Sequence, residues 1–344
     1  MGKRGADGDA VDPEGAEPRP EPFPEQLVRL SYAALASPQT HVATHIGPDG
    51  TVVLWNEHET LVGNLRDQGM RYRFDSATTR VHGILTDSAS GKTAVCCSID
   101  TTVLLYPADV PGEALFVTTM PEAVCCGSIG VYGDVFVAVS ADRVRVVAVY
   151  PFVSPVQLAW VAPSPVLTVV RCRDGPPVIA LGDKTTWRLE PASPGIQFTP
   201  IAADLLEPTE AKGVDFSTNI WITATALGQC AVLVSRGYPH LNDVVLPISP
   251  VAAAWEGRWL FVLGETDPVS HGLEVWAVTP SIGAVCGTYT PEHIGMAPGA
   301  FRQPVAGAPE TDELGDFCTI AGRYVLWYGQ AYILGSPERG THPE

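Results

Sequence analysis

Two short stretches of the sequence contain residue types that bind phosphate or metal ions. Ser90-Gly91-Lys92-Thr93 matches the end of a phosphate-binding loop, in which the lysine and the backbone N–H groups hold the phosphates. The complete motif also needs a glycine where this sequence has Thr86, and a helix where it continues as the apolar stretch TAVCCS. We therefore do not expect a nucleotide here.

The second stretch, His58-Glu59, begins like the zinc-protease motif HExxH, but Val62 stands where the second histidine belongs. His41 and His45 would lie about 13 Å apart on one face of a strand, which is too far for them to share an ion. The sequence also lacks the Gly-x-Ser-x-Gly pattern of serine hydrolases. We therefore predict no catalytic residue, no metal site and no cofactor.

The eight cysteines do not form a metal-binding or disulfide pattern. Four of them occur as the adjacent pairs Cys96-Cys97 and Cys125-Cys126, and no CxxC pair is present. Neighbouring residues of a strand point to opposite faces, so an adjacent pair is poorly placed to hold a metal ion or a disulfide. Unpaired cysteines are typical of a reducing compartment, and we expect the cytoplasm, the nucleus or both.

The charge and composition exclude other classes of function. The formal net charge of −17 opposes direct binding to DNA or RNA and favours protein partners with basic surfaces. Hydrophobic residues make up 46 % of the chain, but no apolar run approaches the ~18 to 20 residues of a membrane span. The N-terminus has no apolar segment of the kind found in secretory signals. We therefore expect no membrane association.

A repeated hairpin pattern must position whatever residues are functional. A glycine, an apolar run, a turn with an aspartate and a second apolar run begin at Gly91, Gly133 and Gly175, which are 42 residues apart. Asp is favoured in tight turns because its side chain bonds to its own backbone two residues on. We assign four further copies: one spans residues 40–55 with Asp49 in the turn, and the others start at Ser217, Gly257 and Gly322. The total is seven.

The repeat predicts an all-β protein. Further apolar runs between the hairpins, such as AVCCGSI and SPVAAAW, give each copy about four strands in about 44 residues, as in a propeller blade. The 33 glycines and 31 prolines are also typical of many short strands joined by turns. We therefore predict a seven-bladed β-propeller with four-stranded blades.

We expect one folded domain between two polar ends. Residues 1–26 contain seven acidic residues and five prolines, which predicts a disordered acidic tail. Residues 27–335 would form the propeller, with residues 27–35 closing the ring against the last blade. Residues 336–344 form a second polar tail.

The hairpins resemble those of WD-repeat propellers. The similarity lies in residues 49–55, 98–106 and 140–146, although the closing Trp-Asp pair of that family is replaced by Tyr106-Pro107 and Tyr150-Pro151. The resemblance implies a degenerate WD-repeat-like, seven-bladed propeller. Propellers of the chromosome-condensation-regulator type are a second possible relative.

We expect a non-catalytic platform for protein–protein interaction, acting as a scaffold or adaptor subunit of a multi-protein complex. Propellers host many functions, so the fold alone does not decide this. Two alternatives stay open. One is a propeller hydrolase or lactonase with a metal ion in the central channel, and the other is an accessory subunit of an RNA- or protein-modifying enzyme.

The partner surface is predicted in the least repeat-like segments, since long loops are often functional. We expect residues 56–75 to form such a loop and 278–315 to form another. One rim would gather the turn residues Asp49, Asp100, Asp142, Asp183 and Lys184, together with residues 265–271. The predicted partner-binding residues are Glu57, His58, Glu59, Arg66, Trp255 and Arg258.

Overall fold

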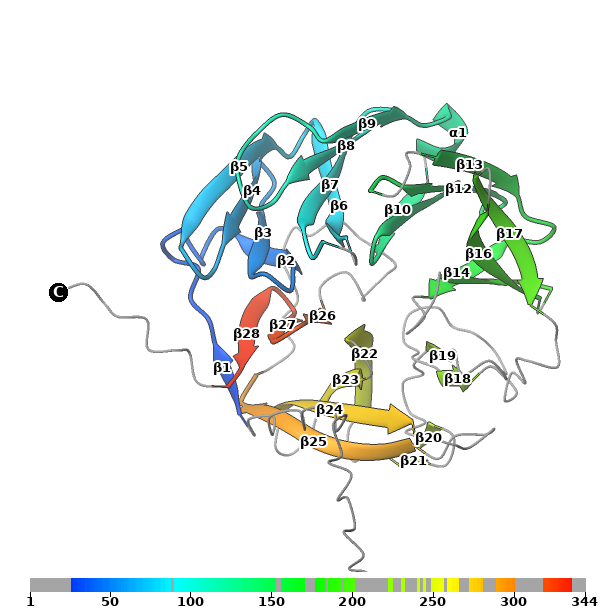
Figure 1. The fold of residues 1–344 in the computed structure, drawn as a ribbon. Coiled ribbons are helices and arrows are strands. Elements are labelled where there is room, and N and C mark those ends of the chain that lie inside the picture. Colours follow the sequence, from blue (N-terminus) through cyan, green and yellow to red (C-terminus); the bar gives the residue numbers. More distant parts are fainter. Residues whose placement is uncertain are drawn as a thin grey trace, which may run out of the picture.

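The chain is arranged as a ring of antiparallel sheets in the computed structural model (Figure 1). The structure describes the following residues: 26–87, 90–125, 127–152, 156–170, 177–183, 185–192, 195–201, 222–224, 230–232, 240–241, 244–245, 249–256, 259–265, 272–280, 289–300 and 318–335. The predicted tails, apart from Gln26, lie outside these residues, as do Lys184, Arg258 and residues 266–271.

Two four-stranded sheets come from the first third of the chain. The first contains β2 (Val42–Ile46), β3 (Thr51–Trp55), β4 (Glu59–Asn64) and β5 (Gly69–Asp75). The second contains β6 (Thr79–Thr86), β7 (Thr93–Ile99), β8 (Thr102–Pro107) and β9 (Phe116–Thr119). In both, sequence order and spatial order agree, so each sheet is a simple meander.

Two more meanders follow. The third sheet contains β10 (Ser128–Tyr132), β11 (Val135–Val139), β12 (Arg145–Tyr150) and β13 (Val156–Val161). The fourth contains β14 (Val166–Val170), β15 (Val178–Leu181), β16 (Thr186–Ala192) and β17 (Gly195–Ile201). One short helix, α1 (Glu122–Cys125), connects the second sheet to the third.

The last third of the chain completes the ring. Two short pairs are β18 (Ile222–Ala224) with β19 (Cys230–Val232), and β20 (His240–Leu241) with β21 (Val244–Val245). The next four-stranded sheet contains β22 (Ser249–Glu256), β23 (Trp259–Glu265), β24 (Gly272–Pro280) and β25 (Tyr289–Pro298). The final one contains β26 (Cys318–Ala321), β27 (Tyr324–Trp327), β28 (Gln330–Leu334) and β1 (Leu27–Arg29).

These sheets are the blades of a β-propeller, because the first strand of each four-stranded sheet lies towards the centre of the ring and the fourth lies outside (Figure 1). The prediction of an all-β propeller with four-stranded blades is therefore confirmed. Six such blades are present among the described residues. The predicted count of seven stays a prediction, with β18 and β19 in the stretch of chain where the additional blade would lie.

The N-terminal strand closes the ring. β1 is the outer strand of the final sheet and pairs with β28 in an antiparallel register, with Leu27 opposite Leu334 and Arg29 opposite Tyr332. Only Leu27–Arg29 is a strand, so the closing strand is shorter than residues 27–35. The chain leaves the sheet after Arg29, and Tyr32 and Leu35 are buried under the first blade.

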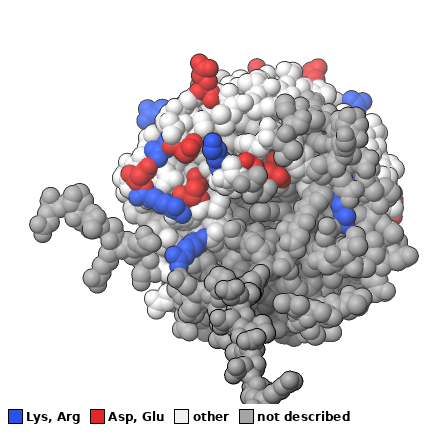
Figure 2. All heavy atoms as spheres, viewed as in Figure 1, with Lys and Arg blue, Asp and Glu red and all other residues white. Residues whose placement is uncertain are grey.

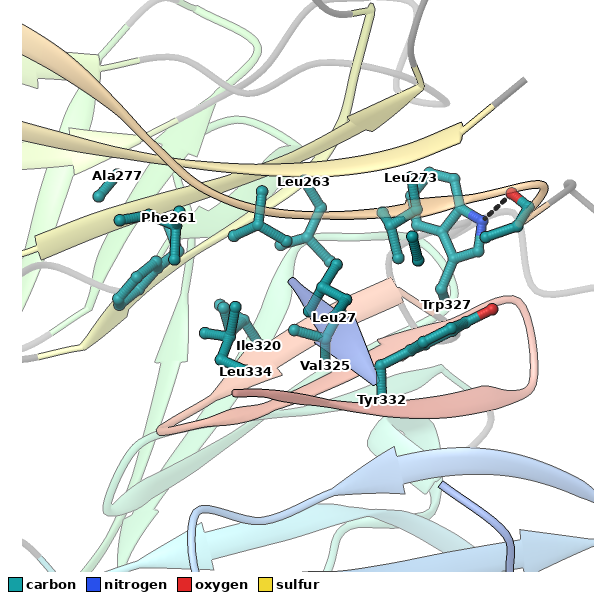
Figure 3. Close-up of a cluster of buried hydrophobic side chains, with 14 of the residues drawn as sticks. Leu27, Phe261, Leu263, Leu273, Ala277, Ile320, Val325, Trp327, Tyr332 and Leu334 are labelled. Carbon is teal, nitrogen blue, oxygen red and sulfur yellow. Dashed lines mark hydrogen bonds between the residues drawn. The ribbon is translucent and has the colours of Figure 1, made fainter. Parts of the chain in front are cut away.

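The hydrophobic core lies between neighbouring sheets. The largest cluster joins the sheet of β22–β25 to the closing sheet, where Phe261, Leu263 and Leu273 face Val325 and Trp327 (Figure 3). The Trp327 indole N–H donates to the carbonyl of Ala300, at 3.2 Å, so its polar atom is satisfied although the ring is fully buried. Similar clusters join the first blade to the closing sheet and the second and third blades to each other.

The meanders give the ring two faces, because the chain reverses direction at every turn. One face holds the turns between the first and second strands of each blade and between the third and fourth strands. We call it the Asp49 face. The opposite face holds the turns between second and third strands, and the connections to the next sheet, and we call it the Asp100 face. Asp49 lies between β2 and β3, whereas Asp100, Asp142 and Asp183 lie between second and third strands.

The predicted single rim of aspartates is therefore wrong for Asp49. The first copy of the repeat was assigned one strand too early, as the glycines show. Gly91 and Gly133 each have a φ of 69° in the turn after a first strand, and Gly50 has a φ of 86° in the same turn of the first blade. Gly50 is thus the equivalent of Gly91, and the turn at Asn56 is the equivalent of Asp100.

The prediction that residues 56–75 form a long loop is also wrong. This segment folds into β4 and β5, the third and fourth strands of the first blade, joined by a short turn at residues 65–68. Residues 278–315 are likewise not a single loop, since β24 extends to Pro280 and β25 spans Tyr289–Pro298.

Candidate interaction surface

The turn between β3 and β4 presents charged side chains from a fixed backbone. The side-chain oxygen of Asn56 accepts hydrogen bonds from the backbone N–H groups of His58, at 2.8 Å, and Glu59, at 2.7 Å. The Asn56 N–H donates to the carbonyl of Glu59, at 3.0 Å, and the Ser76 N–H donates to the carbonyl of His58, at 3.2 Å. These bonds leave the backbone of the turn little freedom.

A buried histidine supports the turn from below. The Asn56 amide nitrogen lies 2.9 Å from His41 Nε2 and donates to it in the tautomer that carries the ring proton on Nδ1. Nδ1 in turn lies 3.0 Å from Thr40 Oγ1. Tyr32 donates its hydroxyl proton towards the backbone carbonyl of His41, at 3.2 Å. The segment that connects the closing strand to the first blade is therefore joined to this turn through His41.

The side chains above the turn are directed to solvent. The side chains of Glu57 and His58 are 78 % and 83 % exposed, and their charged atoms lie 3.6 Å apart. Glu59 is different because its carboxylate accepts from Arg73 Nε at 3.0 Å and lies 3.4 Å from His41 Nε2. Glu57 and His58 are therefore the groups available to a partner, whereas Arg73 is already paired with Glu59.

Arg66 lies on the other face. It is in the turn between β4 and β5, where its Nε donates to the Tyr324 hydroxyl at 2.9 Å and its guanidinium lies 5.7 Å from the centre of that ring. It also donates to the carbonyl of Pro48, at 3.4 Å. Arg66 therefore joins the first blade to the closing sheet, and the structure does not bring it together with Glu57 and His58.

Trp255 and Arg258 are the remaining predicted partner-binding residues. Trp255 is in β22, near the turn that leads to β23 on the Asp49 face, and Arg258 lies outside the described residues. The six predicted partner-binding residues therefore do not form one surface. Glu57, His58 and Glu59 are grouped, and their role in binding stays a prediction.

Two other turn aspartates on the Asp100 face have structural partners. Asp142 accepts from the Ser140 hydroxyl and from the Val144 N–H, and the Ser140 bond is the main cause of its lowered pKa. Asp183 accepts from the Thr185 hydroxyl, at 2.6 Å, and from its N–H, at 2.9 Å, which lowers its pKa in the same way. These bonds fix the turns and show why aspartate recurs there.

The charges on the first two blades do not form a field of one sign. Figure 2 shows acidic and basic side chains interspersed at the upper left, over the part of the ring that Figure 1 assigns to β2–β9. Within the part of the chain that the structure describes, no three His, Cys, Asp or Glu side chains are grouped closely enough to hold a metal ion. Among the same residues, no helix has the length and apolar character needed to cross a bilayer.

Sequence reasoning missed an exposed apolar strip on the second blade. Val110, Leu115 and Val117 are 64 %, 60 % and 56 % exposed, although their sequence reads as an ordinary loop followed by a strand. The only signal was the two-residue spacing of Leu115 and Val117 at the start of a strand whose other face, with Phe116 and Thr118, is partly buried.

Comparisons with known proteins give similar solved structures but no matching sequence. No protein-family model matches the sequence, and no curated protein matches it. Among solved structures, the chain is similar to the RRP9 WD40 repeats, with 11 % identity, 91 % of this chain and 98 % of that one covered, and a TM-score of 0.47.

Two further solved structures are of the same kind. The Cps50 (Swd1) β-propeller domain of Myceliophteria thermophila has 11 % identity over 86 % of this chain and 96 % of that one, with a TM-score of 0.45. The WD40 domain of SCAP from fission yeast has 9 % identity over 92 % and 97 %, with a TM-score of 0.41. These structures are described as WD40 repeats, a WD40 domain and a β-propeller domain, and the similarity concerns the arrangement of sheets alone.

Proposed function

We propose that this protein is a non-catalytic platform that binds other proteins, as a scaffold or adaptor subunit of a multi-protein complex. The main observation is the turn at Glu57 and His58, where side chains about four-fifths exposed stand on a backbone fixed by Asn56 and His41. A surface that is rigid before binding loses less entropy when a partner docks. The adjoining Glu59 and Arg73 satisfy one another, so they extend the surface without offering a reactive group.

The chemistry of the buried thiols agrees with this proposal. Cys96 and Cys97 on β7 are both free and buried. Burial raises the pKa of Cys97 to about 12 and that of Cys96 well above its usual range. A buried thiol with a raised pKa is a poor nucleophile. Both therefore act as small apolar residues, which supports our further proposal that the protein resides in a reducing compartment, the cytoplasm or the nucleus.

Partner recovery from native extract tests the proposed function. Tagged full-length protein should return stoichiometric partners, and Glu57→Lys should reduce their recovery because it reverses an exposed charge at the centre of the turn. Lys92→Glu is the matched control, since Lys92 is exposed near the turn between β6 and β7 on the Asp49 face. Recovery of no partner by the unmodified protein would contradict the proposal.

Metal analysis tests the rival class. A propeller hydrolase would hold one tightly bound Ca²⁺ or Zn²⁺ per chain, and the described residues offer no group of three ligands for it. One equivalent of either ion in protein purified without chelators would overturn the proposal of a non-catalytic platform.

A further inference from the structure

Exposed aliphatic side chains are concentrated on the outer edge of the second blade. Of the four most exposed large hydrophobic residues in the described part of the chain, three are Val110, Leu115 and Val117, which lie within eight positions of one another. We call these three residues the β9 strip. Single exposed apolar residues are ordinary, whereas a group of this kind marks a site of interaction.

Val117 lies in the last strand of its sheet, Leu115 immediately precedes that strand, and Val110 lies in the loop before it. β9 pairs only with β8 in its sheet, with Val117 opposite Leu104. Phe116 points the other way and packs on Phe136 of the third blade, with ring centres 6.5 Å apart. Leu115 immediately precedes β9, and its N–H donates to the carbonyl of Leu105 on β8, at 2.7 Å. With the alternation of an extended chain, Leu115 and Val117 would share the face opposite to Phe116. Leu115 and Val117 therefore have the two-residue spacing that would let them contact alternate side chains of a bound extended segment.

A tyrosine from the first blade holds the loop that carries Val110. The Tyr72 hydroxyl donates to the carbonyl of Pro107, at 2.8 Å, and accepts from the Gly112 N–H, at 3.0 Å. The ring of Tyr72 also contacts those of Phe74 and Tyr106, with centres 5.8 Å and 5.2 Å away. The strip is thus continuous with a partly exposed aromatic group and is fixed before any partner binds.

The charges around the strip are acidic. Asp109 and Glu113 are exposed in the same loop, and neither forms an ion pair with any described residue. The nearby arginines of β5 are already engaged, Arg71 with Asp67 and Arg73 with Glu59. A partner that covers the apolar side chains would therefore meet two unpaired carboxylates, which favour Lys or Arg.

We propose that the β9 strip binds an extended segment of a partner protein with aliphatic side chains at alternate positions and Lys or Arg at one end. This inference rests on the proposed function, because it identifies one kind of partner sequence that the platform would hold. An extended segment fits the spacing of Leu115 and Val117, and its basic end fits Asp109 and Glu113, which both lie in the loop that precedes β9.

Binding of defined peptides to the full-length protein tests the inference. The probes are synthetic peptides of about 10 residues with Val, Leu or Ile at alternate positions, made with Lys and Arg at one end, with Glu at that end or in scrambled order. The protein should bind the basic-ended set best. Leu115→Ser with Val117→Ser should weaken binding by about tenfold or more, and Asp109→Lys with Glu113→Lys should shift the preference to Glu-ended peptides.

A matched control is available on the third blade. Val161 is 71 % exposed on the outer strand β13, so Val161→Ser removes the same kind of surface elsewhere and should leave peptide binding unchanged. The inference is overturned if basic-ended peptides bind no better than scrambled ones, or if the strip variant binds as well as the control. In that event, reduced partner recovery by Glu57→Lys would show that the proposed function still stands.

Discussion

The two ends of the first blade use the same kinds of side chain in opposite ways. On the Asp49 face, the carboxylate of Asp49 accepts from Thr51 and, at 2.6 Å, from Thr93 of the next blade, while Arg66 binds Tyr324 of the closing sheet. On the Asp100 face, backbone groups are satisfied by a neutral amide, that of Asn56, and Glu57 stays in solvent.

The difference separates charged side chains that join neighbouring blades from charged side chains that are exposed for a partner. A charged group that bonds across to a neighbouring blade contributes to stability and has fewer donors or acceptors left for a partner. A charged group above a turn whose backbone is already satisfied contributes little to stability and is available for binding. Exposure alone does not distinguish them, since Arg66 is exposed and still engaged.

The largest expected effect comes from removing the closing strand, on which both ends of the blade depend. A chain lacking residues 1–36 loses buried Leu27, Tyr32 and Leu35, and the bonds from the Tyr32 hydroxyl to the carbonyls of His41 and Gly329. We expect a loss of about 5 kcal/mol or more in unfolding free energy, and a fall in Tm of about 10 °C or more. A chain lacking residues 1–24 is the control, and thermal unfolding should leave it nearly unchanged. Equal Tm values for the two truncations would contradict the closure of the ring by β1.

Asp49→Ala tests the hydrogen bonds that join neighbouring blades on the Asp49 face. It leaves the buried hydroxyl groups of Thr51 and Thr93 without an acceptor. The expected cost is about 2 to 3 kcal/mol in a urea unfolding experiment. Asp49→Asn keeps one acceptor oxygen and should lose less. An Asp49→Ala protein as stable as the original would remove the distinction between the two faces.

A pH titration examines the inner strands that run between the faces. Burial lowers the pKa of His45 on β2 to about 4 and that of His82 on β6 to about 3. Both values lie below the ordinary 6.5, so the unfolded chain takes up protons first as the pH falls. The full stability is present above about pH 6.5 and decreases towards the folded-state values.

At about pH 5 we expect the partly exposed rings of His45 and His82 each to have lowered the unfolding free energy by an amount on the order of 1 kcal/mol. Replacing both histidines by Asn should flatten urea-derived stability between about pH 7 and pH 5. His58→Asn, which changes an exposed ring, should not alter the slope. An unchanged slope in the double variant would show that these rings are not the cause.

The smallest effect on stability is expected from Glu57→Lys. Its side chain is 78 % exposed, and the His58 ring beside it is also exposed, so the unfolding free energy should change by less than about 0.5 kcal/mol. Glu59→Lys should cost more, because it breaks the pair with Arg73. If the two substitutions prove equally costly, the Glu57 turn is a structural contact rather than a presented surface.

Turn chemistry explains which parts of this fold could be predicted. Asp100 and Asp142 marked true turns between second and third strands, whereas in the first blade Pro48-Asp49-Gly50 gave a stronger turn signal than the sequence after Trp55. That stronger signal belonged to the preceding turn, so the copy was assigned one strand too early.

The predicted loop at residues 56–75 contained a sequence signal for a strand, which is an alternation of side-chain types. In β5, Met70, Tyr72 and Phe74 alternate with Arg71 and Arg73, which is the two-residue period of a strand. The grouping of partner-binding residues could not be predicted, because Glu59 and Arg66 are close in sequence but lie at opposite ends of the strand β4 and therefore on opposite faces.

The pairing of Leu27 with Leu334 sets the order of events during synthesis. At ~5 to 20 residues per second, roughly 15 to 60 s pass between the emergence of the two residues from the ribosome. For that time the first strand has no partner, and a nascent chain stopped before β28 can never acquire one. We therefore expect the blades to form in order while the ring stays open, with closure as the last step.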